Sequence, residues 1–436
     1  MFLERKEEGK LHKGSVLVGY DLGEKYSQIS YYVYGEEDAD TVATIVGTKQ
    51  YNIPTMLCKR EGINQWFYGK DAVRNAEEEA MIPVEGLLKR ARKGEEIELD
   101  GESYDPVALL TLFLKRSMTL LNFITTIEKI HSIMFTVDEL DDRMVEILAQ
   151  ASANLGLKTQ QIYFQSHTES FYYFMLHQPP ELWTYQALAC EHDGMRLKTY
   201  RMECNKRTTP IVVLIEEQIY DTLVIPEDTE DEEAKQGAYR LADERFLGIL
   251  KRLCEGRIVS SAYLLGDGFR NEWNVQSLQF LCHNRRVFQG NNLFSKGACY
   301  GLLEKLEPGE AGSRHVFLGK DKLKSNIGMN VLRQGKESYY ALLDAGENWY
   351  EAGGECEVIL CGSPAVDFWF QPPRSAEAVV RSLELSGMQG REDKTTRLRI
   401  SVKPLAADKI QFRIMDLGFG EIVKGSEKVW EYTIAV

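Results

Sequence analysis

The stretch Val16–Val33, VLVGYDLGEKYSQISYYV, decides how the rest of the sequence is interpreted. Its apolar start, Val16–Tyr20, predicts a strand, Asp21–Lys25 predicts a turn, and the alternating residues Ser27–Val33 predict a return strand. A plain hairpin accounts for the pattern, because aspartate and glycine favour turns. Alternatively, the turn amides face a phosphate and the Asp21 carboxylate holds hydrated magnesium. The rest of the chain must decide between the two.

Composition and charge narrow the class of protein. At 436 residues the chain predicts two or three domains. The formal net charge of −14 argues against a nucleic-acid partner, because such partners need a basic surface. No stretch is apolar for long enough to span a membrane, and the charged start Met1–Lys13 is unlike a signal peptide. We therefore expect a cytoplasmic protein that binds neither nucleic acid nor membrane, with residues 1–13 as a flexible tail.

The metal-binding residue types form no recognisable motif. The eight cysteines include no C-x-x-C pair, which indicates reduced and mostly buried thiols. The seven histidines are scattered without the spacing of a zinc site. We expect no metal that is held by protein ligands alone.

The hairpin pattern recurs in the middle of the chain. Tyr185–Glu191 and Met195–Met202 predict strands, with a turn at His192–Gly194 between them. Each hairpin begins a stretch that ends in helices, which indicates two related α/β lobes facing a cleft. Between the hairpins, a helix is expected over Asp138–Leu155, with Asp138 as its N-cap.

The second lobe is expected to continue through a strand, a glycine turn and a helix, an order that lets a ligand approach the backbone at a helix N-terminus. The expected elements are a solvated acidic loop at Glu227–Glu233, a helix at Gln236–Cys254, a strand at Ala262–Leu265, the turn Gly266–Phe269, and helices at Asn271–Cys282 and Ser295–Leu306.

The last part of the chain has a different character. The polar, turn-rich segment 307–315 is interpreted as a linker. Beyond it, residues 316–436 predict a β-sandwich, whose length is usual for an independent domain. Its expected strands are Tyr339–Leu343, Glu357–Cys361, Arg397–Val402, Ile410–Met415 and Val429–Ile434.

In their order along the chain, these motifs resemble the seventy-kilodalton heat-shock chaperones of the DnaK type, members of the actin-like ATPase superfamily. VGYDLGEKYS (18–27) is similar to the family's first phosphate loop, and LLKRARKGEEIELDGESYDP (87–106) to the segment with its catalytic lysine. YLLGDGFR (263–270) is similar to the adenosine loop, and HVFLGKDKLKSNIGM (315–329) to the start of the peptide-binding sandwich. The resemblance implies an α/β fold, with an actin-like two-lobed nucleotide-cleft domain of ribonuclease-H-like halves at 14–306.

The resemblance also implies roles for individual residues. Asp21 would hold magnesium through water, and Gly23, Glu24 and Lys25 would meet the terminal phosphates of ATP or ADP. Lys89 would approach the transferred phosphate, although a solvated lysine in a basic run explains it equally well. The loop that would bind adenosine comprises Gly266, Asp267, Gly268 and Phe269.

The chain departs from the family at the second phosphate loop. The glycines needed there are replaced by Cys190–Met195, in which Glu191 and Asp193 would repel a phosphate. The family's water-positioning acid is replaced by Ser166. Glu169 has two interpretations. It is a displaced catalytic acid, or it is a surface or helix-capping glutamate, and the surface or capping role is favoured. Catalysis should therefore be weak or absent.

Two further family elements are missing from the pattern. Only about sixty residues separate the second hairpin from the adenosine loop, too few for the helical subdomain that forms one wall of the family's cleft. No sequence follows the sandwich to form a helical lid, so an open groove is expected.

The expected function is therefore binding of a protein or peptide partner by the β-sandwich, on a pseudo-ATPase scaffold that binds ATP or ADP with magnesium weakly if at all. The alternative is an active ATPase or small-molecule kinase that uses Asp21, Lys89 and Glu169. A filament-forming structural protein ranks last. The sequence does not indicate the oligomeric state.

Overall fold

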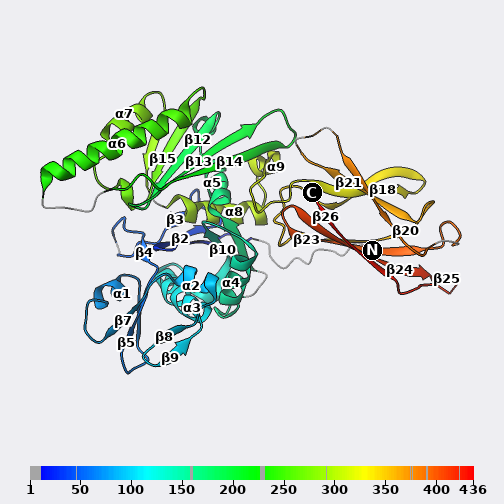
Figure 1. The fold of residues 1–436 in the computed structure, drawn as a ribbon, viewed down its shortest axis with the longest axis horizontal. Coiled ribbons are helices and arrows are strands. Elements are labelled where there is room, and N and C mark those ends of the chain that lie inside the picture. The colour runs from blue at the N-terminus through cyan, green and yellow to red at the C-terminus, as the bar shows by residue number, and fades with distance from the viewer. Residues whose placement is uncertain are drawn as a thin grey trace. The chain divides into compact units, whose positions relative to one another are not determined.

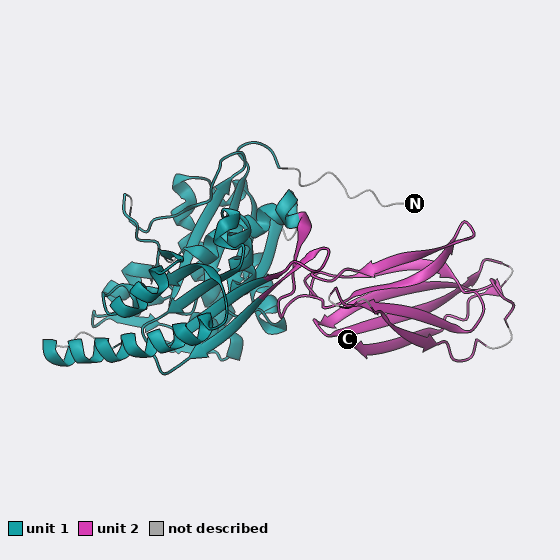
Figure 2. Cartoon of the chain, turned by 90° about the horizontal axis from the view of Figure 1, so that it is seen from above, with its two compact units in different colours: residues 1–203, 215–312 teal, residues 204–214, 313–436 magenta. Residues whose placement is uncertain are grey.

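The computed structural model describes residues 11–45, 47–157, 161–225, 231–290, 292–373, 375, 377–388, 391–421 and 423–436. The fold is mixed α/β with several β-sheets. The chain divides into two compact units, coloured separately in Figure 2: residues 1–203 with 215–312, and residues 204–214 with 313–436. Within the described residues, no helix combines the length and apolar composition needed to cross a membrane.

The first sheet is built around the opening hairpin (Figure 1). Its strand order is β11-β10-β1-β2-β3, in which β1 runs antiparallel to β2 and parallel to β10, and β10 runs parallel to β11. A short strand, β4, also pairs with β2. The bounds are β1 Val16–Leu22, β2 Tyr26–Val33, β3 Asp40–Thr41, β4 Ile53–Pro54, β10 Ile130–Val137 and β11 Ile162–Ser166.

The second sheet repeats this arrangement. Its order is β16-β15-β12-β13-β14, with β17 paired to β14. Strand β12 runs antiparallel to β13 and parallel to β15, so the same five-strand order occurs twice. The bounds are β12 Gln186–His192, β13 Leu197–Asn205, β14 Ile211–Tyr220, β15 Val259–Leu265, β16 Arg286–Gln289 and β17 His315–Phe317.

Two helices, α5 (His167–Leu176) and α8 (Leu293–Leu306), link the sheets. Helix α8 packs on β1, β2 and β10, whereas Phe171 of α5 makes edge contacts with the rings of Tyr200 and Tyr263 in the second sheet. The two helices approach closely at Gly297, where an added Cβ would lie 2.0 Å from the Ser170 carbonyl oxygen. Only glycine permits this contact.

The remaining helices of the first unit cover outer faces or form small extensions. Helices α6 (Glu232–Cys254) and α7 (Val275–Cys282) cover the outer face of the second sheet (Figure 1). Smaller elements lie between β4 and β10: α1 Gly69–Asn75, α2 Leu87–Lys93, α3 Pro106–Ser117, the sheet of β5 Leu57–Arg60, β6 Trp66–Tyr68 and β7 Met81–Val84, and the hairpin of β8 Ile97–Leu99 and β9 Glu102–Tyr104.

Several expected boundaries are wrong. Helix α4 runs over Asp142–Ala153, and its N-cap is Asp141, whose side chain accepts the Met144 N–H at 2.8 Å. Asp138 therefore does not cap this helix. In the expected acidic loop, Glu232 and Glu233 belong to α6, whereas residues 226–230 lie outside the described residues, as do residues 1–10 of the expected tail.

The expected linker 307–315 is partly regular structure. Helix α9 (Glu310–Arg314) occupies its second half, and β17 begins at His315. The last of the three divisions between the compact units falls between Gly312 and Ser313, within this segment.

The second unit contains two sheets that share one core. One has the order β19-β18-β21-β22, and the other has the order β20-β23-β24-β25 with β26 also paired to β24. Phe368 and Phe412, one from each sheet, are fully buried with ring centroids 4.4 Å apart. The bounds are β18 Asn326–Arg333, β19 Lys336–Leu343, β20 Gly354–Ile359, β21 Ala365–Gln371, β22 Val379–Glu384, β23 Arg397–Ala406, β24 Lys409–Phe419, β25 Val423–Lys424 and β26 Val429–Ala435.

Candidate functional site

The first element of the candidate site is a buried pair between Asp21 and His167. Strand β1 continues through Leu22, so Asp21 is a strand residue, 8% exposed, and not part of an open turn. Its Oδ1 lies 2.8 Å from Nε2 of His167, the first residue of α5. Burial lowers the pKa of His167, but the Asp21 carboxylate raises it, and the net shift is upward. The imidazole stacks on the ring of Phe294 at 4.0 Å between centroids.

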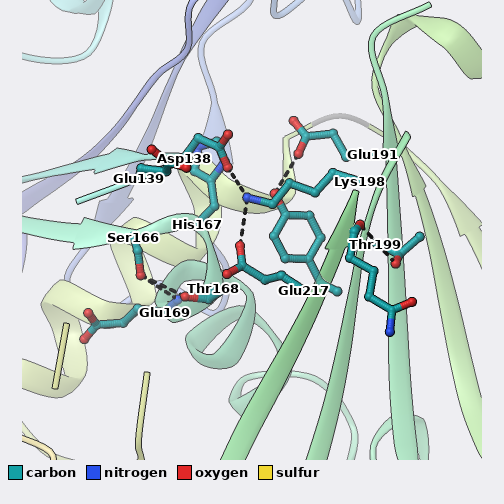
Figure 3. Close-up of polar contacts among 12 residues, drawn as sticks. Asp138, Glu139, Ser166, His167, Thr168, Glu169, Glu191, Lys198, Thr199 and Glu217 are labelled. Atoms are coloured by element: carbon teal, nitrogen blue, oxygen red, sulfur yellow. Dashed lines mark hydrogen bonds and ion pairs between the residues drawn. The ribbon is translucent and has the colours of Figure 1, made fainter. Parts of the chain in front are cut away.

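A lysine from the second sheet joins the same group. Lys198 of β13 has an 8% exposed side chain and forms ion pairs with Asp138, which follows β10, and at 2.7 Å with Glu217 of β14 (Figure 3). Nδ1 of His167 lies 3.9 Å from Oδ1 of Asp138. Burial lowers the pKa of Lys198, but the two carboxylates outweigh it and the net shift is upward. The Lys198–Asp138 pair thus connects the two sheets of the first unit.

Glu191 and Tyr200 complete this group. The Tyr200 hydroxyl donates to Oε2 of Glu191 at 2.8 Å. Burial raises the pKa of Glu191 and outweighs the opposing effect of His167. We use the term inter-sheet cluster for these seven residues: Asp21, Asp138, His167, Glu191, Lys198, Tyr200 and Glu217.

The second hairpin turn is filled by His192. This side chain is fully buried; its Nδ1 accepts the Gly194 N–H at 2.9 Å, and its Nε2 lies 2.9 Å from the Leu223 carbonyl oxygen, to which it donates. Burial lowers the pKa of His192. The neutral imidazole with its proton on Nε2 satisfies both contacts.

The expected adenosine loop packs against this imidazole. A Cβ added at Gly268 would lie 2.0 Å from Nδ1 of His192, and one added at Gly266 would lie 2.3 Å from the His192 carbonyl oxygen. Phe269 is buried in the core beneath α6, and Oδ1 of Asp267 accepts from Asn52 at 3.0 Å. The close approach that these glycines allow is therefore made by His192.

The first turn contacts α2 through Glu24. Oε2 of Glu24 accepts the backbone N–H of Lys89 at 3.2 Å, and burial raises the pKa of Glu24 against this hydrogen bond. The Lys25 ammonium lies 5.5 Å from the ring centroid of Tyr26. A Cβ at Gly23 would lie 2.3 Å from the Tyr26 carbonyl oxygen, so the turn itself requires glycine here.

The two expected catalytic residues lie in different surroundings. Lys89 is exposed on α2, and in the described part of the chain it forms no ion pair with Asp21. Glu169 is only 3% exposed, so the interpretation as a surface residue is wrong. It lies in the first turn of α5, where its N–H donates to Oγ of the N-cap Ser166 at 3.4 Å.

The sequence interpretation missed His167, Lys198 and Glu217 as members of a site. One signal was available for Lys198. In a strand, alternate residues share a face, so Lys198 lies on the same face as Tyr200 and Met202, where a lysine needs a partner. Among the described residues, no group of three or more histidine, cysteine, aspartate or glutamate side chains is arranged to hold a metal ion.

Comparisons with known proteins place the chain in a family without assigning a function. A search of the curated proteins finds no match. A domain of unknown function, DUF8552, matches residues 322–436. The C-terminal part of a family of unknown function, DUF5716, matches residues 38–320, which is more than half of the chain. The chain therefore belongs to the DUF5716 family.

Proposed function

We propose that this protein is a divergent relative of the DnaK-type chaperones, in which a pseudo-ATPase scaffold carries a module that binds a protein or peptide. The repeated strand order β11-β10-β1-β2-β3 and β16-β15-β12-β13-β14 supports an actin-like pair of ribonuclease-H-like halves. The two-sheet β-unit that follows supports the likeness to the chaperones' peptide-binding domain.

The observation that carries the proposal is the inter-sheet cluster. A hydrolytic site needs Asp21 available for hydrated magnesium and glycine amides available for phosphate. Here Asp21 is paired with His167, and His192 fills the second turn. A phosphate at the end of β12 would also meet Glu191, and two like charges about 4 Å apart at an effective dielectric constant of 20 repel by about 4 kcal/mol.

The same cluster supports a scaffold role. In the chaperones, the bound nucleotide lies between the two lobes and bridges them. Here Lys198 and Asp138 bridge the two sheets directly, and Glu217 holds the other side of the ammonium group. Protein side chains thus take the place that the nucleotide would occupy as a bridge.

The β-unit offers a surface for an extended partner. Trp369 is opposite both Val380 and Gly328 in the strand register, so the three share the outer face of their sheet. The Tyr339 hydroxyl would be 2.5 Å from a Cβ at Gly328, so this ring lies over the glycine. Tyr339 is 48% and Val380 43% exposed, and β22 is the last strand in the sheet order. An extended peptide can add to such an edge.

Nucleotide binding by the full chain tests the proposal. The matched variant is Asp21→Asn, because Asp21→Ala would leave buried His167 without its hydrogen-bond acceptor. We expect magnesium ATP to give no thermal shift and no hydrolysis for either protein. If the wild type hydrolyses ATP and folded Asp21→Asn does not, the scaffold proposal fails and the alternative of an active ATPase or kinase is supported.

A further inference from the structure

A cavity lies entirely within the first unit, and it shares no lining residue with the inter-sheet cluster. Its volume is ≈ 580 Å³, within the range of roughly 300–1,000 Å³ that is usual for small-molecule sites. Four segments line it: the first hairpin turn, the segment between β4 and β5, helix α1 and the loop before α2. The residues are Glu24, Lys25, Tyr26, Pro54, Thr55, Met56, Lys70, Val73, Arg74, Glu85 and Gly86.

The lining combines an apolar wall with a basic rim. Tyr26, Pro54 and Met56 present apolar surface, and Met56 is buried. From α1, Lys70, Val73 and Arg74 follow the i, i+3, i+4 spacing of one helical face. An apolar wall beside charged groups can orient a ligand by its polar end.

The three cations of the rim, Lys25, Lys70 and Arg74, have only weak partners. The Lys25 ammonium faces the Tyr26 ring and forms no ion pair among the described residues. Lys70 donates to the neutral amide oxygen of Gln50 at 2.6 Å. Arg74 pairs with Asp71 at 2.9 Å, but their side chains are 76% and 60% exposed, and such surface pairs contribute little stability. All three cations can therefore turn to a ligand without breaking a buried contact.

Two carboxylates in the lining do not cancel these cations. Oε2 of Glu24 accepts the backbone N–H of Lys89 on α2 at 3.2 Å, so one of its oxygens already has a partner. The lining holds three cations, Lys25, Lys70 and Arg74, against two carboxylates, Glu24 and Glu85, so it keeps an excess of one positive charge.

We propose that this cavity binds a small organic anion, a carboxylate or phosphate monoester with an aromatic or branched aliphatic body. The body would pack against Tyr26, Met56 and Val73, and the anionic group would be bound by Lys70 and Arg74 with Lys25. This site is independent of the inter-sheet cluster and needs neither magnesium nor Asp21.

The test uses four probes on the full chain: phenyl phosphate, benzoate, inorganic phosphate and neutral benzyl alcohol. Binding is measured by isothermal titration calorimetry and by ligand-observed NMR, without magnesium. We expect saturable binding of phenyl phosphate, benzoate or both, at least about tenfold tighter than that of inorganic phosphate or benzyl alcohol. The first comparison tests the apolar wall, and the second tests the charge.

Three variants on α1 locate the site. Lys70→Ala and Arg74→Ala should each weaken anion binding about tenfold, and Val73→Trp should abolish it by filling the cavity. These side chains are exposed, so the variants should fold. Lys93→Ala is the matched control, because Lys93 is an exposed lysine on α2 outside the cavity lining and should leave binding unchanged.

Three results would overturn the proposal. The first is no saturable binding of either organic anion at millimolar concentration. The second is binding that all three α1 variants leave intact. The third is binding that Asp21→Asn abolishes while the α1 variants retain it, which would assign the ligand to the inter-sheet cluster.

Discussion

Replacement of Lys198 by methionine isolates the energetic role of the inter-sheet cluster. Methionine keeps the apolar length of the side chain but removes the cation that separates Asp138 from Glu217. Removal of one partner from a fully buried ion pair typically costs about 3–5 kcal/mol, because the other charge is left unpaired. Glu217 has a 14% exposed side chain, but that of Asp138 is 41% exposed and water can solvate it. We therefore expect a loss of about 3 kcal/mol, at the lower end.

Differential scanning calorimetry of the full chain measures this loss. The first unit contains about 300 residues, and unfolding entropy near 2.1 cal/mol/K per residue converts about 3 kcal/mol into a fall of about 5 °C in the Tm of that unit. The second unit should keep its transition. Lys115→Met, which replaces an exposed lysine on α3, is the matched control and should leave both transitions unchanged.

A double variant separates the unpaired charge from lost packing. In Lys198→Met with Glu217→Gln, one of the two carboxylates is neutral, so about half of the lost stability should return. The reasoning is refuted if Lys198→Met leaves the first transition within about 1 °C of the wild type. It is also refuted if the second substitution lowers the Tm further.

Three further predictions concern other parts of the chain. The pKa of His167 is raised above its ordinary value of 6.5, so the charged imidazole stabilises the fold fully below pH 6.5. This stabilisation is lost as the pH rises through the raised pKa. The Tm difference between wild type and His167→Gln should therefore shrink from pH 6 to pH 9. Gly268→Ala should destabilise the first unit by about 1–3 kcal/mol in urea unfolding, because the new Cβ overlaps His192, and addition of His192→Ala should recover part of this loss. Arg391→Ala should destabilise the second unit by about 3 kcal/mol, because the fully buried Asp416 carboxylate keeps only its contacts with Ser426 and Gly418. Only the Tm of the second calorimetric transition should fall. An equal fall in the Tm of both transitions would contradict independent unfolding of the units.

Local patterns predicted four helices and both hairpins, but they missed helices α1, α2, α3 and α5 and strands β21 and β22. Both hairpins and the five C-terminal strands were found close to their expected positions, because alternation and turn residues act over a few neighbours. The predicted start of α4 was wrong, because either of two aspartates, Asp138 and Asp141, could have served as its N-cap. In the structure Asp141 caps the helix, whereas Asp138 pairs with Lys198, sixty residues later in the sequence.

The candidate site was harder to predict for the same reason. Asp21 was recognised from its strand and turn, but its partner His167 lies 146 residues away in sequence. Only the folded sheets bring the end of β1 to the start of α5. The glycines at 266 and 268 were recognised as places of close approach, yet what approaches them is the side chain of His192. Glycines in a sequence can thus indicate where two parts of the backbone come close, but they do not identify the side chain that occupies the space.

The division of the chain into units has a consequence for biosynthesis. The chain crosses between the units three times, and residues 204–214 belong to the second unit although first-unit sequence flanks them. Residues 211–213 of β14 pair with residues 315–317 of β17. Strand β14 therefore emerges from the ribosome about one hundred residues before the strand with which it pairs. Pairings between strands far apart in sequence form slowly, and a strand edge that is still unpaired is prone to aggregate. We therefore expect nascent chains that end between residues 214 and 315 to depend on chaperones more than the finished protein does.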